Sequence, residues 1–216
     1  ETGPACTPDE HARLVREMVH SLGYQGPVGI GFPGPIKNGT PWMAVNLHPD
    51  WVDLNAAGMF SEATGLPCFM VNDADAAGLA EIRYGAGQDW ANKVIYVCTL
   101  GTGIGSSIFV NGNLLPNSEL GHITLRDEDA EQRASDAARR LKGLSWKKWA
   151  KRLQEYFEEI EKLISPDLII IGGGVSKESE KFLPLLRLKA QVVPAKLLND
   201  AGIIGAALYA CQQTLK

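Results

Sequence analysis

The 216-residue sequence lacks the features that mark several special classes of protein. It has no apolar run approaching the ~18 residues that cross a bilayer, and no charged-then-apolar signal peptide at its start. Its cysteines are few and far apart, which predicts reduced thiols rather than a disulfide framework; they are Cys6, Cys68, Cys98 and Cys211. The net charge of -4 gives no general reason to expect nucleic acid. We therefore expect a cytoplasmic protein without membrane or nucleic-acid partners.

What the sequence does contain is enough apolar surface for a hydrophobic core. Hydrophobic residues make up 45% of it and charged residues 21%, which fits one large domain or two small ones. Strand and helix patterns alternate in the first part of the chain and predict an α/β fold. Near residue 92 the order changes to strand, glycine turn, strand, Asn-Gly turn and strand. We predict two domains, residues 1–91 and 92–216, and consider that the last helix packs back on the first.

Helix end signals are clear at two places in the chain. Thr7 has the position of an N-cap, a proline follows it, and Glu10 stands where a capping box requires it. Ser145 is the expected cap of a long helix whose apolar residues recur at helical spacing. The stretch "PCFMVNDADAAGLAEIRYG" predicts a strand that ends at Asn72 and Asp73 and is followed by another helix.

Asp73 is the first candidate for chemistry. It stands at the carboxyl end of an apolar strand, just before a helix, where open α/β sheets place their ligands. A carboxylate at this position is well placed to act as a general base. Aspartate also caps helices, so Asp73 or Asp75 could instead be the N-cap of the following helix. The sequence leaves both roles open.

Two glycine-rich stretches follow apolar strands. In "LGTGIGSS" the alternating glycines, the first of them Gly101, allow positive φ and leave N–H groups free for an anion, and Thr102 and Ser106 add hydroxyl donors. The same pattern also marks ordinary hairpins and bulges. In "IIIGGGVS" a strand, Gly172–Gly174 and a predicted helix form a helix N-terminus that can accept a phosphate or nucleotide. Together the two stretches indicate phosphoryl chemistry.

Glu119 and His122 flank Gly121 at the end of the third strand of the predicted meander. A carboxylate and a neutral imidazole around a glycine are suited to hydrogen-bonding the vicinal hydroxyls of a sugar. A histidine in this position can also be purely structural. Neither a second histidine nor a cysteine lies at metal-ligand spacing, so we expect no metal here.

A basic run extends from Arg139 to Arg152 without one acidic residue, and glutamates follow nearer the C-terminal end of the long helix. This order opposes the helix dipole by roughly a few tenths of a kcal/mol per charge. A solvated helix face is the usual meaning of such a run. The inverted order also supports the hypothesis that an external polyanion binds there, at Lys147, Lys148, Lys151 and Arg152.

Taken in order, "VNDADAAGLAE", "LGTGIGSSI", "SELGHI", "EQRAS" and "IIIGGGVSKESEKFLP" resemble the ROK family of repressors, uncharacterised open reading frames and sugar kinases. Within the family the sequence is most similar to the polyphosphate glucokinases, over nearly its whole length. The resemblance implies an actin-like, ribonuclease H-like ATPase fold of two domains with glucose bound in the cleft between them. It further implies phosphoryl transfer from polyphosphate, with ATP as another candidate donor, to the glucose 6-hydroxyl, Mg²⁺ on the donor, and a homodimer.

The resemblance also assigns roles to individual residues. Asp73 of "VNDA" would take the proton from the sugar 6-hydroxyl. The residues that would bind the sugar are Asn46, Asn72, Asp73, Glu119, His122 and Glu131. Those that resemble the family's second phosphate motif and its adenosine motif are Gly101, Thr102, Gly103, Gly172, Gly173 and Gly174.

Two departures from the family pattern bear on activity. The Cys-rich zinc motif is absent between His122 and Glu131, so we expect no structural zinc. The sequence starts at Glu1 without the Asp-Gly-Gly-Thr hairpin of the family's first phosphate motif. We therefore expect an N-terminally truncated first domain, and little or no kinase activity from these 216 residues.

Three other functions remain open at this point. An ATP-dependent kinase for another hexose is one, because the Glu-x-Gly-His motif serves several sugars. A sugar-sensing repressor would need an N-terminal helix-turn-helix, and nothing of that kind precedes Thr7. A sugar-binding protein without catalysis would bind glucose and transfer nothing to it.

Overall fold

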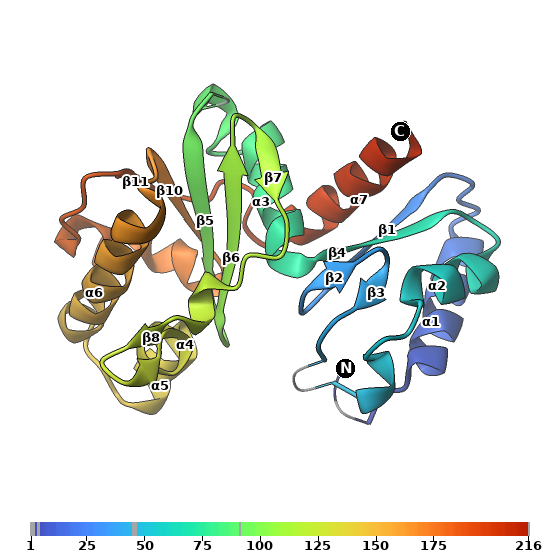
Figure 1. Cartoon of the computed structure of the whole chain (residues 1–216), viewed down its shortest axis with the longest axis horizontal. Helices are drawn as coiled ribbons and strands as arrows, with labels where there is room; N and C mark the ends of the chain where they lie inside the picture. The colour runs from blue at the N-terminus through green and yellow to red at the C-terminus, as the bar shows by residue number, and fades with distance from the viewer. Residues whose placement is uncertain (1–2, 4, 45–46, 91, 216) are drawn as a thin grey trace. The chain divides into compact units, whose positions relative to one another are not determined.

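The computed structural model describes residues 3, 5–44, 47–90 and 92–215, which form two compact units (Figure 1). Unit 1 comprises Glu1–Ala77 and Gly202–Lys216, and unit 2 comprises Gly78–Ala201. The expected boundary between residues 91 and 92 falls within unit 2, and residue 91 lies outside the described residues. The assignment of functional domains stays a prediction.

Unit 1 is built on a two-stranded parallel sheet in which β1 (Val28–Phe32) pairs with β4 (Cys68–Asn72). The other elements with residues in this unit are α1 (Pro8–Ser21), β2 (Ile36–Lys37), β3 (Thr40–Pro41), η1 (Pro49–Trp51), α2 (Ala56–Thr64), α3 (Asp73–Tyr84) and α7 (Ala201–Thr214). A Cβ added to Gly205 would lie 1.6 Å from the Ala76 carbonyl oxygen, so glycine lets α7 lie directly against α3.

Helix α1 begins as its sequence predicts. The Thr7 hydroxyl accepts a hydrogen bond from the Glu10 N–H, and the Glu10 carboxylate accepts one from the Thr7 N–H at 2.8 Å. This capping box satisfies two backbone donors that the helix itself cannot pair. The apolar face is only partly buried: Val19 packs inside, but side chains on the same helix are 45–78% exposed, namely Leu14, Met18 and Leu22.

Unit 2 contains a five-stranded mixed sheet in the order β11-β10-β5-β6-β7. The central strand β5 (Val94–Leu100) runs parallel to β10 (Leu168–Gly172) and antiparallel to β6 (Ile104–Val110). The edge strands are β11 (Gln191–Pro194) and β7 (Asn113–Leu115). The remaining elements are η2 (Gln88–Trp90), η3 (Leu120–His122), β8 (Thr124–Leu125), β9 (Glu128–Asp129), α4 (Ala130–Ala134), α5 (Asp136–Leu141), α6 (Trp146–Ile164), η4 (Gly174–Lys181), η5 (Leu183–Leu185) and η6 (Leu198–Asp200).

Helix α6 supplies much of the core of unit 2, as its apolar spacing predicts. Ser145 caps it through a hydrogen bond from the Lys148 N–H, and Trp149, Leu153 and Phe157 are fully buried against the sheet. The Asn-Gly turn between β6 and β7 is also confirmed, with Asn111 at φ 52° and its neighbouring glycine at φ 76°.

Two local predictions for unit 2 are wrong. The segment after Gly172–Gly174 is a 3₁₀ helix broken by non-helical backbone at Glu178, not a regular helix, so its aligned dipole is short. Glu119 and His122 do not end the third strand of the meander, because β7 stops at Leu115 and the histidine belongs to the turn η3.

The four cysteines are free thiols, as their spacing predicts, and Cys68 and Cys98 are buried. No helix within the described ranges has both the length and the apolar character needed to cross a bilayer.

Candidate functional site

The junction between β4 and α3 carries Asn72 and Asp73, the first candidate pair. Asn72 Oδ1 accepts hydrogen bonds from the N–H groups of Ala74 at 2.9 Å and Asp75 at 3.0 Å. The buried asparagine is therefore the N-cap of α3. The cap that sequence analysis considered for Asp73 or Asp75 is supplied by their neighbour.

Asp73 has an exposed side chain, yet protein atoms remove part of the water around its carboxyl group. This desolvation raises the pKa of Asp73, and it outweighs hydrogen bonds from the backbone of Ala74 and of Asp73 itself. A cavity of about 290 Å³ within unit 1 is lined by Asp73 and by apolar side chains such as Phe32 and Trp51. The apolar wall gives the physical reason for the direction of the shift, and a carboxylate with a raised pKa is a stronger proton acceptor.

Unit 1 also contains Asn46 in the sequence, but this predicted sugar contact lies outside the described residues. Of the predicted sugar-binding residues in this unit, the structure therefore describes Asn72 and Asp73, and the role of Asn46 stays a prediction.

The first glycine turn joins β5 to β6 in unit 2 and differs from its sequence-based interpretation. Its glycines do not adopt positive φ. A Cβ on Gly103 would lie 2.1 Å from Glu131 Oε2, so this carboxylate would have to move, whereas a Cβ on Gly101 would have no atom within 4 Å. The space beside Gly101 is open, and Thr102 between the two glycines is exposed.

The second glycine turn lies beside the first. In the parallel pair of β5 and β10, Gly172 is opposite Thr99, so both strands end at the same edge of the sheet. Gly173 has φ 80°, and a Cβ on it would lie 2.3 Å from the Leu100 carbonyl oxygen. Gly174 has open space around it. Backbone from both turns therefore meets at the carboxyl edge of two parallel strands, where α/β sheets bind ligands.

Ser106 is not available as a phosphate donor, contrary to the sequence-based expectation. Its side chain is buried, donates to the Ser118 carbonyl oxygen at 2.7 Å and accepts from the Leu120 N–H at 3.0 Å. It holds the segment that precedes His122. Tyr156 on α6 donates to the Leu120 carbonyl oxygen at 3.3 Å, so this segment is anchored from two elements.

Close packing fixes the turn that carries His122. A Cβ on Gly121 would lie 1.9 Å from the Ile104 carbonyl oxygen, so only glycine lets η3 approach β6 this closely. Glu119 precedes the turn and is partly buried. The glycine of the Glu-x-Gly-His motif is thus explained by contact with the sheet rather than by positive φ.

His122 is half exposed, and its Nδ1 lies 2.9 Å from Asp129 Oδ2. This hydrogen bond, with smaller contributions from the charges of Asp129, Glu131 and Glu119, raises the pKa of His122 against the effect of its partial burial. Sequence analysis missed Asp129. The signal that could have found it is an acidic N-cap at the start of "AEQRA", because Asp129 also accepts hydrogen bonds from the first turn of α4.

Glu131 connects α4 to the first glycine turn. Its Oε2 accepts a hydrogen bond from the Ile104 N–H at 2.9 Å, directly beside Gly103. In unit 2 the structure therefore links His122, Asp129 and Glu131 to the Gly101–Gly103 turn through consecutive contacts.

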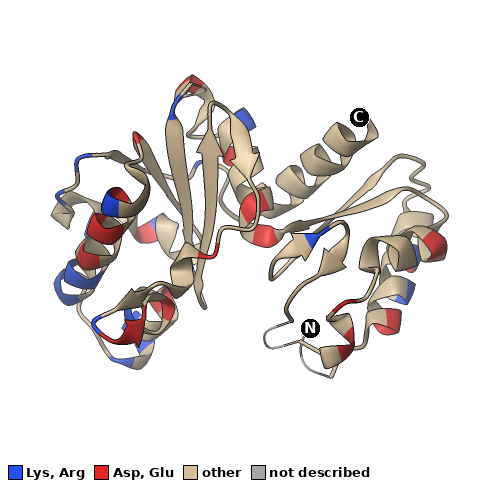
Figure 2. Ribbon diagram, in the orientation of Figure 1, with Lys and Arg blue, Asp and Glu red and all other residues tan. Residues whose placement is uncertain are grey.

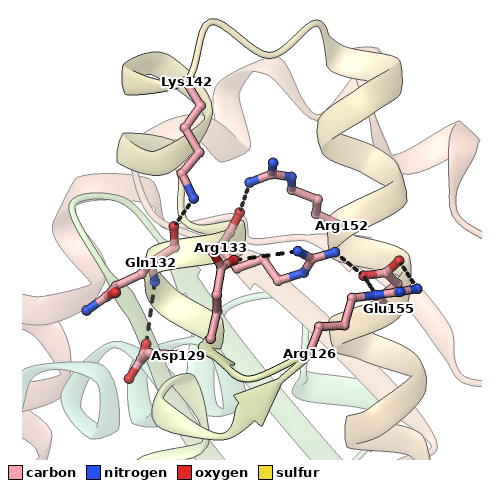
Figure 3. Close-up of polar contacts among 8 residues, drawn as sticks. Arg126, Asp129, Gln132, Arg133, Lys142, Arg152 and Glu155 are labelled. Atoms are coloured by element: carbon pink, nitrogen blue, oxygen red, sulfur yellow. Dashed lines mark hydrogen bonds and ion pairs between the residues drawn. The ribbon is translucent and has the colours of Figure 1, made fainter.

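The basic run divides into engaged and exposed side chains. Figure 2 shows lysines and arginines on the early turns of α6 and acidic residues on later ones. In Figure 3, Arg152 donates to the Arg133 carbonyl oxygen and Lys142 donates to the Gln132 carbonyl oxygen. Three lysines have exposed side chains whose ammonium groups make no hydrogen bond or ion pair with another residue that the structure describes: Lys147, Lys148 and Lys151.

Over the described part of the chain, no three His, Cys, Asp or Glu side chains are grouped so that they could hold a metal ion. The expectation that the chain has no structural zinc stays a prediction.

Comparison with known proteins identifies the family and the fold. The model of the ROK family matches residues 8–134. The polyphosphate glucokinase of Mycobacterium tuberculosis (strain CDC 1551 / Oshkosh) is 41% identical over 214 residues, which are 99% of this chain and 80% of the relative. The crystal structure of inorganic polyphosphate/ATP-glucomannokinase from Arthrobacter sp. strain KM matches with a TM-score of 0.89 at 44% identity, over 97% of this chain and 85% of that one.

A more distant structure shows the breadth of the fold. The ROK family glucokinase from Streptomyces griseus, in complex with glucose and AMPPNP, matches with a TM-score of 0.78 at 24% identity, over 97% of this chain and 90% of that one. At this identity the similarity shows the fold alone.

Proposed function

The chain belongs to the ROK family and has the actin-like ATPase fold of its sugar kinases, and we propose that it transfers a phosphoryl group from inorganic polyphosphate to the 6-hydroxyl of glucose. The observation that carries this proposal is Asp73, a solvent-accessible carboxylate with a raised pKa where a strand ends and a helix begins. The choice of polyphosphate and glucose rests on the relatives. ATP is a second donor to test, because the Arthrobacter enzyme is named for both.

In the proposed reaction, Asp73 accepts the proton of the sugar 6-hydroxyl. The oxygen of that hydroxyl at the same time forms a bond to the terminal phosphorus of the donor. The bond from that phosphorus to the bridging oxygen breaks, and polyphosphate leaves one unit shorter. Phosphoryl transfer needs mainly alignment of the reactants and stabilisation of charge. A base whose pKa is raised toward neutrality adds a chemical contribution, because it accepts the proton of the attacking hydroxyl. The desolvation of Asp73 supports this role.

Sugar binding is assigned to the polar residues that match the sugar-binding motifs of the ROK kinases. We propose that Asn72 of unit 1 and Glu119, His122 and Glu131 of unit 2 contact glucose hydroxyls, with Asn46 as a further contact. The hydrogen-bonded support behind His122 and the turn before it favours this assignment, because ordered polar groups lose less entropy on binding.

Donor binding is assigned to the two adjoining glycine turns, Gly101–Gly103 with Thr102, and Gly172–Gly174. Open space beside Gly101 and Gly174 would admit phosphate oxygens to both turns, but the Gly101 N–H itself already donates to the Gly103 carbonyl oxygen at 3.0 Å. We propose that Mg²⁺ accompanies the donor and neutralises its charge. Magnesium bound in this way uses phosphate oxygens, water and one or two carboxylates, so it needs no cluster of three acidic side chains.

The exposed lysines of α6 are proposed to bind the distal part of the polyphosphate chain. Contact between the Ala137 N–H and the Gly101 carbonyl oxygen, at 3.0 Å, joins the start of α5 to the first glycine turn, and the basic run continues from there into α6. Arg152 is the weaker member of the predicted set, because its guanidinium already holds the Arg133 carbonyl oxygen.

The proposed function is tested by following glucose 6-phosphate formation with polyphosphate or ATP as donor and glucose or mannose as acceptor. We expect polyphosphate and glucose to support turnover, and Asp73→Asn to lower kcat by about 10²- to 10⁴-fold with little change in glucose affinity. Asp9→Asn, an exposed change in the first turn of α1, is the matched control. Unchanged kcat in Asp73→Asn would exclude the base. Turnover at a normal rate would show that the sequence-based expectation of little or no kinase activity for these 216 residues is wrong.

The polyphosphate contact is tested by replacing Lys147, Lys148 and Lys151 together with glutamine. We expect a higher KM for polyphosphate, a weaker dependence of that KM on salt, and an unchanged KM for ATP, because only the long donor reaches α6. Replacing three exposed lysines elsewhere in unit 2, namely Lys93, Lys177 and Lys189, gives the control for net charge. Equal effects of both triple variants would contradict the assignment. A homodimer stays a prediction, which light scattering would test.

A further inference from the structure

The hydrogen bond between Asp129 and His122 orders the ring of a proposed sugar ligand, and it also bears on which ring nitrogen the sugar meets. We propose that Asp129 is a positioning residue that fixes the tautomer and orientation of the His122 imidazole, so that Nε2 is the ring nitrogen presented to a sugar hydroxyl. This inference rests on the proposed function, because it assigns a sugar contact to His122.

The two side chains differ in which atoms can donate and accept hydrogen bonds. An ionised carboxylate only accepts hydrogen bonds, so at 2.9 Å from Asp129 Oδ2 the Nδ1 atom of His122 must carry its proton. The neutral ring then has its lone pair on Nε2, which accepts a hydrogen bond from a hydroxyl. A protonated ring would donate from Nε2 instead. Asp129 thereby decides which polar group the half-exposed imidazole offers.

Asp129 is itself held in place by its second oxygen. Oδ1 accepts hydrogen bonds from the N–H groups of Glu131 at 2.8 Å and Gln132 at 3.4 Å, the latter drawn in Figure 3. The side chain therefore spans two elements, with one oxygen at the start of α4 and the other on the ring of η3. A carboxylate fixed at both oxygens has little freedom to release the imidazole.

The charges that face His122 come from three places. Asp129 ends β9, Glu131 lies in α4, and Glu119 precedes η3; all three favour the protonated ring, and the partial burial of the ring opposes them. The contact with Asp129 contributes most. Removing that one charge should therefore lower the pKa of His122 without removing the other two.

The backbone of the His122 turn does not depend on Asp129. Ser106 accepts from the Leu120 N–H, Tyr156 donates to the Leu120 carbonyl oxygen, and Gly121 packs on β6. An asparagine at position 129 can still cap α4 through its oxygen, since asparagine is a good N-cap. Its amide nitrogen would then donate to Nδ1 and favour the opposite tautomer, with the proton on Nε2.

The experiment combines side-chain nitrogen NMR with glucose binding measured by calorimetry, so that it needs no turnover. The protein has four histidines, and His122→Gln identifies the resonances of His122. In the wild type we expect the tautomer with the proton on Nδ1. In Asp129→Asn we expect the Nε2 tautomer, a lower pKa for His122, and about tenfold weaker glucose binding. Asp129→Ser keeps a capping oxygen that is too short to reach the ring, and should lose the tautomer preference.

Asp127→Asn is the matched control, because it removes one negative charge two residues before Asp129. Asp127 is exposed and has φ 62°, a backbone conformation that asparagine tolerates. It should leave both the tautomer and glucose binding unchanged. If His122→Gln weakens glucose binding but Asp129→Asn changes neither tautomer nor affinity, the positioning role of Asp129 is wrong and the sugar contact stands. If His122→Gln leaves glucose binding unchanged, the sugar contact itself is wrong and the inference falls with it.

Discussion

Asp73 in unit 1 and His122 in unit 2 both have raised pKa values, but for opposite reasons. Asp73 loses water without gaining a cationic partner among the causes of its shift, and desolvation penalises its charged form. His122 stays half exposed and gains a carboxylate partner that favours its charged form. The first arrangement makes a stronger proton acceptor, and the second makes an oriented hydrogen-bonding group. The pKa of Asp73 is therefore raised by its surroundings, and the pKa of His122 by its hydrogen-bond partner.

The surroundings of the two residues differ in the same way. Beside Asp73, a Cβ added to Gly31 would meet atoms of Asp73 only at 3.9 Å, an ordinary contact. Beside His122, a Cβ on Gly121 would lie 1.9 Å from backbone of β6, and the preceding segment is anchored by Ser106 and Tyr156. The backbone at Gly31 therefore leaves room beside Asp73, whereas the turn that carries His122 is tightly packed.

The largest expected effect on stability comes from adding a methyl group at Gly121, compared with the same change at Gly31. Gly121→Ala forces η3 away from Ile104, and we expect it to destabilise unit 2 by about 2–4 kcal/mol and to weaken glucose binding. Gly31→Ala is the paired variant in unit 1 and should change stability by less than about 1 kcal/mol. Urea unfolding measures both. Similar losses in the two variants would contradict the difference in packing.

A smaller effect is expected from Ser106→Ala. Loss of the hydroxyl leaves the Leu120 N–H and the Ser118 carbonyl oxygen without this partner, which should cost about 1–3 kcal/mol and raise the KM for glucose more than it lowers kcat. Ser107→Ala is a matched control, because Ser107 is also buried on β6 and its Oγ has no hydrogen-bond partner among the described residues. An equal rise of KM in both variants would show that Ser106 acts only through the fold.

The smallest effect is the dependence of stability on pH through His122. Its pKa is raised in the folded protein above the ordinary 6.5, so the contribution of the pair with Asp129 is fully present below that unfolded value. It is lost as pH rises through the folded-state pKa. Because the ring is half exposed, we expect less than about 1 kcal/mol. The difference in unfolding free energy between the wild type and His122→Gln, followed from pH 5 to 9, checks the sign; a difference that grows with pH would contradict it.

Much of the fold could be predicted because its signals are local. The capping box at Thr7, the cap at Ser145 and the Asn-Gly turn each depend on a few neighbouring residues. The strand end at Asn72 and Asp73 was predicted in the same way, from an apolar run followed by polar residues. The predicted 3.6-residue periodicity placed α6 but could not tell a 3₁₀ segment from a helix after Gly174, where the pattern is short.

The candidate site could be predicted only in part, since its support is not local. Glu131 reaches the Ile104 N–H across 27 residues, and Tyr156 reaches Leu120 across 36. Gly121 is explained by close packing against the backbone of β6, which no sequence pattern states. Asp129 was missed because it meets His122 only when a β-hairpin folds back between them.

The central claim, that Asp73 is a base tuned by desolvation, is tested most directly by the pH dependence of kcat/KM for glucose with polyphosphate as donor. We expect an acidic limb whose pKa lies above the ordinary 3.8 of an aspartate and which disappears from the residual activity of Asp73→Asn. The limb should persist in Asp129→Asn, where Asp73 is untouched. A limb that keeps the same pKa in Asp73→Asn would contradict the claim.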